Sequence, residues 1–143
     1  FTASGNYVYT ARDYDSGDTT CSGQPVSTLI YIFKPTFAES GTPNVHKIDI
    51  ELKKVMAITS TPARTAQLQS GLDGACPSHG VTLREGMMND LTGRCSAIAP
   101  DIQYSLIGLT TGSPNHIQIG DIYSGLDGST PELRPTTLIS TPI

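Results

Sequence analysis

The sequence predicts an all-β fold, an antiparallel barrel or strongly curved sandwich with one short helix. Apolar and polar residues alternate with a period of two in several segments, and Gly, Pro, Asn and Asp separate those segments. Such alternation is the pattern of strands with one face in a core, and many short strands between turns are typical of barrels and sandwiches. Only one stretch carries helix signals. The length of 143 residues predicts a single domain, 1–143.

The clearest strand lies between His46 and Ile58. Its even positions are mostly apolar, while the odd positions from Lys47 to Lys53 are charged. Lys54 interrupts the alternation, and a β-bulge at this point would restore it. Further strands are expected in "NYVYTAR", "VSTLIYIF", "DIQYSLIGL", "IQIGDIY" and "RPTTLIS", the last confined to a sheet edge or a strand start by its proline.

The stretch "STPARTAQLQSGLDG" breaks the strand pattern. Ser60 or Thr61 is a candidate N-cap, Pro62 suits the first helical position, and Gly71 is placed to end the helix. We therefore predict a short helix near 62–69. The following residues to Asp101 are expected to be rich in loops, with one possible strand at "VTLRE".

The charge balance excludes some partners. Charged residues make up 15% of the chain and the net charge is −4, whereas nucleic-acid binding requires a basic stripe. No apolar run is long enough for a membrane-spanning helix. We therefore expect no nucleic-acid partner and no transmembrane segment. The chain opens within a strand pattern and without an initiator Met, which is typical of a processed or truncated product.

The three cysteines favour an oxidising compartment. Cys76 and Cys95 lie in polar, turn-rich stretches, "GACPSHG" and "TGRCSA", whereas buried structural thiols favour apolar surroundings. We predict a Cys76–Cys95 disulfide and an extracellular or cell-envelope location. A reduced cytosolic thiol is the alternative for each cysteine. Cys21 then lacks a partner within the chain.

Three carboxylates in "RDYDSGD" form the one candidate metal site. Asp13, Asp15 and Asp18 are close enough in sequence to chelate calcium. However, their spacing is not that of an EF-hand, and Asp and Gly are ordinary residues of hairpin loops. A turn is the favoured interpretation, with calcium a minor alternative here and at Asp73 and Asp127. No other cofactor is expected.

No stretch of the sequence carries a catalytic signature. The chain has no GxSxG elbow, no HExxH pattern and no GxxxxGK phosphate loop. Ser78 and His79 could suggest a nucleophile and a base, but adjacent residues rarely face each other productively. We expect a protein that is not an enzyme. A small hydrolase that uses Ser78 or His79 with a distant carboxylate is a minor alternative.

A series of short motifs adds a family resemblance. In chain order they are "FTASGNYVYTARDYDSGDTTC", "KIDIEL", "TPARTAQLQ", "ACPS", "LTGRC", "YSLIGL", "IQIGD" and "ELRPTTL". This order, from Gly5 to Leu138, resembles a family of small secreted bacterial proteins, often lipoproteins, of unassigned biochemical role. That family is similar to the extracellular domain named for the adenomatosis-polyposis-coli-down-regulated proteins. The resemblance implies a lipocalin-like barrel and carries no catalytic residues.

The resemblance also implies a missing strand. Members of the family usually begin with a further strand that carries a Trp and a Cys, and that Cys is the natural partner for one like Cys21. This chain has no Trp and no such segment. We therefore expect a domain without its upstream strand, whose open edge could pair with another chain, or a Cys21 that pairs between chains.

Together these observations predict a non-enzymatic extracellular or cell-envelope binding or surface protein. Small barrels can hold one ligand, so a small apolar molecule or lipid is expected, although core packing is the commoner use of aromatic residues. The alternative is a self-assembling structural surface subunit, joined through an open strand edge or Cys21. The residues expected to hold the ligand are Tyr7, Tyr9, Ile30, Ile48, Ile50 and Tyr104.

Overall fold

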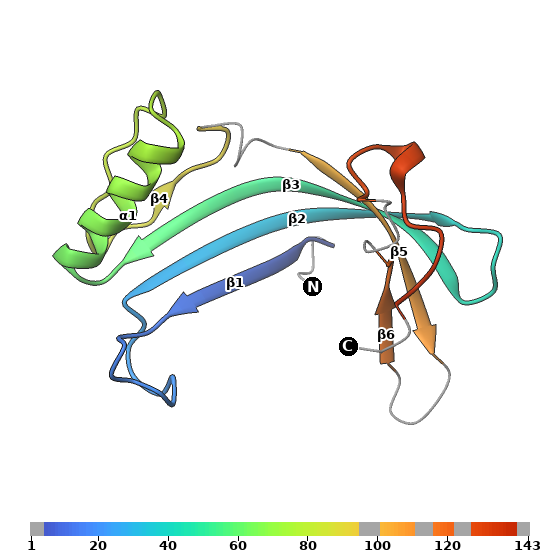
Figure 1. Ribbon diagram of the computed structural model, residues 1–143, viewed down its shortest axis with the longest axis horizontal. Helices are drawn as coiled ribbons and strands as arrows, with labels where there is room; N and C mark the ends of the chain where they lie inside the picture. The colour runs from blue at the N-terminus through green and yellow to red at the C-terminus, as the bar shows by residue number, and fades with distance from the viewer. Residues whose placement is uncertain (1–4, 95–100, 111–115, 122–126, 140–143) are drawn as a thin grey trace. The chain divides into compact units, whose positions relative to one another are not determined.

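The structure, a computed structural model, is mostly antiparallel sheet with one α-helix, which confirms the predicted fold class and fits a lipocalin-like fold. It describes residues 5–94, 101–110, 116–121 and 127–139. The strands are ordered β1-β2-β3-β5-β6, with β4 beside β3. The elements are β1 (Tyr7–Asp13), β2 (Ser27–Glu39), β3 (Val45–Thr59), α1 (Pro62–Ala75), β4 (Asn89–Asp90), β5 (Ile102–Thr110), β6 (His116–Ile119) and the 3₁₀ helix η3 (Pro131–Leu133) (Figure 1).

The chain forms two compact units. The first comprises Phe1–Phe33 and Leu52–Pro100, and the second comprises Lys34–Glu51 and Asp101–Ile143. The long strands β2 and β3 each contribute residues to both units. No helix in the described part of the chain has both the length and the apolar character needed to cross a membrane.

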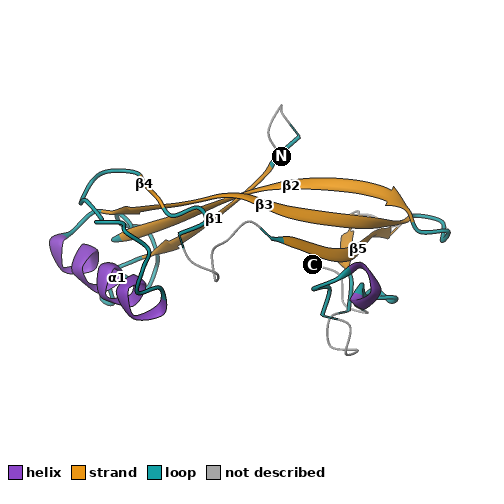
Figure 2. Ribbon diagram, turned by 90° about the horizontal axis from the view of Figure 1, so that it is seen from above, coloured by secondary structure: helices purple, strands orange, loops and turns teal. Residues whose placement is uncertain are grey.

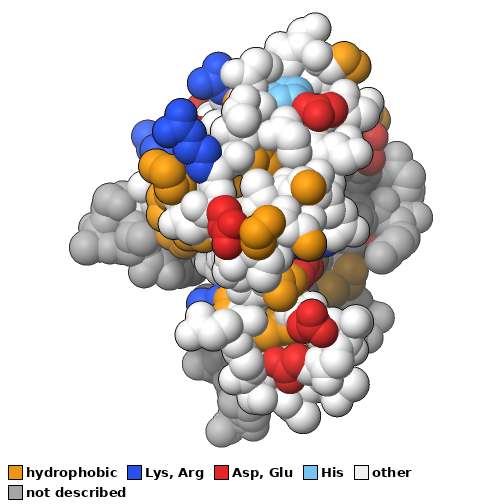
Figure 3. Space-filling view, turned by 90° about the vertical axis from the view of Figure 1, so that its left-hand side faces the viewer, with side chains coloured by type: hydrophobic (Ala, Val, Ile, Leu, Met, Phe, Trp, Pro, Cys, Tyr) orange, Lys and Arg blue, Asp and Glu red, His pale blue; other side chains and the backbone are white. Residues whose placement is uncertain are grey.

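In the first unit, α1 covers one face of the sheet (Figure 2). Its core is a small apolar cluster in which Val55 is 1% exposed and Ala57 is fully buried. Side chains from β2, α1 and the segment after the helix surround these two residues. The buried members are Val55, Ala57, Leu83 and Leu91, and the partly buried ones are Leu29, Tyr31, Leu52, Leu68, Leu72 and Val81. On the face that Figure 3 presents, small groups of apolar side chains lie among the backbone and other side chains, and Lys and Arg side chains gather at one side.

The helix begins where the sequence predicts and ends later. Thr61 is the N-cap, and its hydroxyl accepts from the Arg64 N–H at 3.2 Å. The helix continues past Gly71 to Ala75, so the expectation that Gly71 ends it is wrong. Leu68 and Leu72 lie one turn apart and both pack on the core cluster. Burying these side chains offsets the cost of glycine in a helix, about 1 kcal/mol.

The possible strand at 81–85 does not form. Instead, side chains of neighbouring segments bind its backbone. The Val81 N–H donates to His79 Nδ1 at 2.9 Å, and the Leu83 N–H donates to Gln69 Oε1 at 2.8 Å. These bonds satisfy the buried backbone without a partner strand. Val81 and Leu83 can therefore pack against the core from a loop.

Strand β3 changes phase where the lysine pair interrupts the alternation. Leu52 and Val55 pack in the same cluster although they are three residues apart. In a regular strand, residues three apart point to opposite faces. Lys53 and Lys54 lie between them and are exposed. This arrangement agrees with the irregularity that the sequence predicts there.

In the second unit, β5 pairs with both β3 and β6. In the segment predicted as a last strand, "RPTTLIS", the described residues up to Ile139 form a single bridge, between Gly120 and Leu138. Glycines let this segment approach the sheet closely: a Cβ on Gly120 would lie 2.7 Å from Pro135 Cβ, and one on Gly108 would overlap Leu138 Cδ1. The Asp121 N–H donates to the Thr137 carbonyl at 2.8 Å, and the Ile139 N–H donates to the Ile119 carbonyl at 2.9 Å. The C-terminal segment therefore joins the sheet through both backbone bonds and side-chain packing.

Candidate functional site

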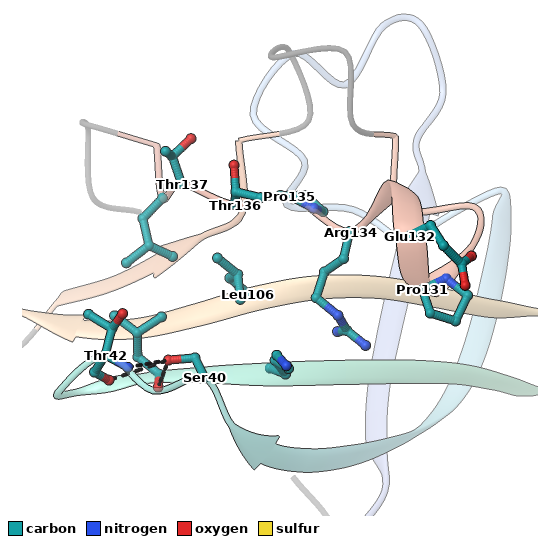
Figure 4. Close-up of a pocket in the computed structure, with 12 residues that line it drawn as sticks. Ser40, Thr42, Leu106, Pro131, Glu132, Arg134, Pro135, Thr136 and Thr137 are labelled. Atoms are coloured by element: carbon teal, nitrogen blue, oxygen red, sulfur yellow. Dashed lines mark hydrogen bonds between the residues drawn. The ribbon is translucent and has the colours of Figure 1, made fainter.

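The candidate site is a pocket of about 550 Å³ in the second unit, here called the C-terminal pocket (Figure 4). Its volume lies within the range of small-molecule sites. Three segments contribute: the turn between β2 and β3, the facing positions of β3 and β5, and the chain from η3 onward. The lining residues are Ser40, Thr42, Val45, Lys47, Leu106, Pro131, Glu132, Arg134, Pro135, Thr136, Thr137 and Leu138.

The register of β3 and β5 builds one wall of the pocket. Lys47 lies directly opposite Leu106, and Val45 lies opposite Gly108. Opposed residues of an antiparallel pair project to the same face, so alternate residues of each strand reach the pocket. Leu106 lies between β5 and the C-terminal segment (Figure 4) and is buried. The wall is thus apolar, with one ammonium group beside it.

Arg134 ties the C-terminal segment to both strands. Its Nη1 donates to the carbonyl oxygens of Ile48 at 2.9 Å and Ser105 at 2.8 Å. Its Nη2 pairs with the Asp49 carboxylate, and the guanidinium lies 5.2 Å over the centre of the Tyr104 ring. The side chain is 13% exposed. Figure 4 shows it extending from the C-terminal segment toward the strands. These contacts therefore fix the C-terminal segment to β3 and β5 beside the pocket.

Two other charged side chains line the pocket. Lys47 is exposed, and none of the ion pairs in the described part of the chain includes it. Glu132 lies in the single turn of η3, where hydrogen bonds from its own backbone N–H and from the Thr130 hydroxyl lower the pKa of its carboxyl group. Glu132 is therefore ionised at neutral pH. At the opposite side, the Ser40 hydroxyl donates to the Val45 carbonyl at 2.7 Å and accepts from the Thr42 N–H at 3.1 Å (Figure 4).

The residues that the sequence predicts as ligand-binding do not share one face. In the first unit, Tyr7 and Tyr9 lie opposite Phe33 and Tyr31, and their rings form a ladder with centroids about 6 Å apart. Ile30 lies opposite Thr10 and so projects to the other face. Tyr9 is 49% exposed, so this ladder is a surface feature.

The second unit separates its predicted residues in the same way. Tyr104 lies opposite Asp49, whereas Ile48 and Ile50 lie opposite Ser105 and Gln103. Tyr104 therefore shares a face with Asp49, and the two isoleucines project to the other side. Alternation along β3 correctly separated polar from apolar positions, but the sequence did not give the register that decides which residues meet.

The three candidate calcium ligands have separate partners. Asp13 accepts from Ser27 Oγ at 2.6 Å and pairs with Arg64, and these bonds, the first more strongly, lower the pKa of its carboxyl group. Asp15 accepts from the Gly17 N–H at 3.0 Å. Asp18 accepts at 2.7 Å from the Gly23 N–H, the largest cause of its own lowered pKa.

These carboxylates do not gather into a metal site. In residues 5–94 and the other described ranges, no group of three His, Cys, Asp or Glu side chains is arranged to hold a metal ion. Asp73 and Asp127 likewise bind protein groups, His79 and the Ser129 N–H respectively. Asp13 and Asp15 do line a second pocket, of about 450 Å³, but Arg64 lines it as well. The guanidinium supplies the positive charge next to Asp13.

His79 has a carboxylate partner, as a catalytic base would, yet neither ring nitrogen is available. Nδ1 accepts from the Val81 N–H, so the proton of the neutral ring is on Nε2, which donates to Asp73 Oδ1 at 2.7 Å. The residue is 7% exposed. A base must have a free nitrogen within reach of the nucleophile's proton. The pair instead joins α1 to the loop that follows it.

The cysteines differ in their surroundings. Cys21 is free and exposed. Cys76 is buried at the C-cap of α1 and is not a free thiol. Cys95 lies outside the described residues, so the Cys76–Cys95 disulfide stays a prediction.

Sequence reasoning missed the residues that form the C-terminal pocket. Lys47 and Leu106 belong to predicted strands, but only the pairing register makes them neighbours. Arg134 precedes a buried proline in "ELRPTTL". An arginine there carries no local signal of burial, because the groups it binds are about 30 and 85 residues away along the chain. No protein-family model matches this chain, and no curated protein matches it.

Proposed function

We propose that this protein is a non-enzymatic binding protein that takes a small, largely apolar ligand into the C-terminal pocket. The observation that carries the proposal is the pocket itself. It measures about 550 Å³, and five apolar residues, among them Val45, Leu106 and Leu138, line it together with seven polar or charged ones. Small-molecule sites use apolar lining for affinity and polar groups for orientation.

Two further observations support binding over catalysis. Both nitrogens of His79 are bound within the protein, which argues against this residue as the base of the alternative hydrolase. Arg134 is committed to two carbonyl groups and Asp49, so it holds the pocket instead of meeting a reacting group. The sequence pattern around Cys76 and Cys95 and the resemblance to small secreted bacterial proteins support an extracellular or cell-envelope location.

A neutral fluorescent probe tests this function. N-phenyl-1-naphthylamine should bind the wild-type protein with a rise in fluorescence, and Thr136→Trp should abolish the rise by filling the pocket. Thr136 is exposed at the pocket lining, so the variant should keep its fold. Thr82→Trp, at an exposed position of the first unit, is the matched control and should bind as the wild type does. Equal binding by both variants, or none by the wild type, would refute the proposal.

The second candidate is a self-assembling surface subunit, and the exposure of β1 favours it. This strand ends the sheet order, and Val8 and Tyr9 are 39% and 49% exposed. An exposed, apolar edge strand can pair with a strand of another chain. Size-exclusion chromatography from micromolar to millimolar protein, with and without reductant, distinguishes edge pairing from a bond through Cys21. A monomer at every concentration would exclude assembly.

A further inference from the structure

We propose that the ligand of the C-terminal pocket is an amphiphile with one negative charge, a monocarboxylate on an apolar body. This inference rests on the proposed function and adds a chemical class to it. Two basic residues line the pocket. Arg134 binds groups of the protein, whereas Lys47 takes part in none of the ion pairs found among the described residues.

The apolar body is required by the surfaces that face one another across the pocket. Val45 and Leu106 come from the two strands, and Pro135 and Leu138 come from the C-terminal segment. Leu106 and Pro135 are already buried within the protein, whereas Val45 and Leu138 are only half-buried. A hydrocarbon or aromatic group against Val45 and Leu138 would remove apolar surface from water, at about 25 cal/mol per Å².

Arg134 does not supply the positive charge for a ligand. Three acceptors of the protein already bind its two terminal nitrogens, and its guanidinium stacks on Tyr104. With an exposure of 13%, it is a fixed part of the pocket. A ligand anion that took this arginine would leave Asp49 without its cation.

Lys47 supplies the charge instead. It lies opposite Leu106 in the register, so both side chains project to the same face, and both line the pocket. It is exposed and takes part in none of the ion pairs found among the described residues. An ammonium group offers three donors to a carboxylate. Thr136 and Thr137 also line the pocket, but their hydroxyls point away from Leu106 in Figure 4, so Lys47 is the donor expected to meet the carboxylate.

Glu132 limits the ligand to a single charge and orients it. The hydrogen bonds at the start of η3 keep this carboxyl group ionised at neutral pH. In Figure 4 it lies on the opposite side of the pocket from Ser40 and Thr42. A second negative charge on the ligand would meet Glu132, whereas a neutral end would not. The carboxylate of the ligand therefore lies toward Lys47 and away from η3.

Isothermal titration calorimetry with three amphiphiles that share a ten-carbon chain tests the inference, at low ionic strength and below the micelle concentration of each. Decanoate should bind about tenfold more tightly than decanol, since one charge-assisted hydrogen bond is worth about that much, and decyltrimethylammonium should bind more weakly than decanol. Lys47→Gln should remove the preference for decanoate and leave decanol unchanged. Lys47→Arg should restore it. Lys34→Gln changes the net charge equally at an exposed position outside the pocket lining, so it is the control.

The outcomes separate this inference from the function it rests on. If decanoate and decanol bind equally and Thr136→Trp blocks both, the carboxylate is wrong and the pocket function stands. If no amphiphile binds and the neutral probe also fails, both are wrong. If Lys47→Gln weakens decanol as much as decanoate, the lysine shapes the pocket and recognises no charge. In the expected case, 0.5 M salt weakens decanoate and leaves decanol unaffected.

Discussion

Arg134 and Asp49 form an ion pair that connects the C-terminal segment to strand β3. The two side chains differ in exposure: that of Arg134 is 13% exposed and that of Asp49 is 40% exposed. The arginine also donates to the carbonyls of Ile48 and Ser105, on two different strands. A single side chain thus joins three segments that lie far apart in the sequence.

Replacing this arginine should be among the most destabilising single changes in the second unit. Arg134→Gln leaves two carbonyls and one carboxylate without their donor, so we expect a loss of about 2–3 kcal/mol in the free energy of unfolding. Arg134→Lys should recover only part of it, because an ammonium group lacks the planar fork that reaches separate acceptors. Urea unfolding measures both. A loss below about 0.5 kcal/mol in Arg134→Gln would show that the contacts are not made in solution.

Replacing glycine with alanine should change the stability of the protein in opposite directions at two positions. In Gly120→Ala the new methyl group would lie 2.7 Å from Pro135 Cβ and 2.8 Å from Ser105 Oγ. The proline ring cannot rotate away, so we expect a loss of about 1–3 kcal/mol. In Gly71→Ala the methyl group meets nothing within 4 Å inside α1. That change should stabilise the protein by about 0.5–1 kcal/mol.

Thermal unfolding of the two alanine variants in the same buffer provides the comparison. The melting temperature should fall for Gly120→Ala and rise for Gly71→Ala. A rise at both positions would mean that the C-terminal segment does not pack on Gly120. A fall at both would mean that α1 ends before Gly71.

Asp13 should make the protein sensitive to acid. Ser27 and Arg64 lower the pKa of its carboxyl group below 3.8 in the folded state. A lowered folded-state pKa gives stability that is complete above the unfolded-state pKa and is lost as the pH falls through the folded-state pKa. The loss should therefore appear below about pH 4 and stay at about 1 kcal/mol or less, because both side chains of the ion pair are partly exposed.

Urea unfolding of Asp13→Asn between pH 7 and pH 3 isolates this contribution. The variant should be less stable than the wild type at pH 7 and should approach it as the pH falls. Arg64→Gln should remove a smaller part of the same pH dependence, since the Ser27 bond is the larger cause of the shift. A difference between Asp13→Asn and wild type that stays constant with pH would contradict this explanation.

The predicted Cys76–Cys95 disulfide has a direct chemical test. Under denaturing, non-reducing conditions the wild type should have one thiol that reacts with a maleimide, and after reduction it should have three. A bridge that closes a loop of about 20 residues should contribute about 3 kcal/mol. Once Cys76→Ser has broken the bridge, adding Cys95→Ser should cost little more stability, and Cys21→Ser alone should lose little. Three reactive thiols before reduction would exclude the bridge.

The sequence predicts the strands of this protein better than their pairing. Alternation in 46–58, including the interruption at Lys53 and Lys54, marks the long strand β3, because a half-buried strand has a period of two. The N-terminus of α1 is equally local, since Thr61 and Pro62 act within one turn. These features depend on neighbours in the chain and are therefore visible without a structure.

The end of α1, the segment that follows it and the pocket depend on contacts between residues that are distant in the sequence. The end of α1 is set by Leu72 packing on β3, which outweighs the local preference of Gly71. The segment from Val81 to Leu83 is held by Gln69 and His79 instead of a strand. The pocket requires Lys47 to face Leu106 and Arg134 to cross both strands. No periodicity within one segment specifies such pairings.

The central claim, that a ligand binds in the C-terminal pocket, is tested most directly by nuclear magnetic resonance. Backbone amide shifts of ¹⁵N-labelled protein would be followed during a titration with N-phenyl-1-naphthylamine. We expect the largest changes at Val45, Lys47, Leu106 and Leu138, all from the pocket lining, and no comparable change in Thr136→Trp. Changes centred on the aromatic ladder at Tyr7 and Tyr9, or no saturable change anywhere, would contradict the account.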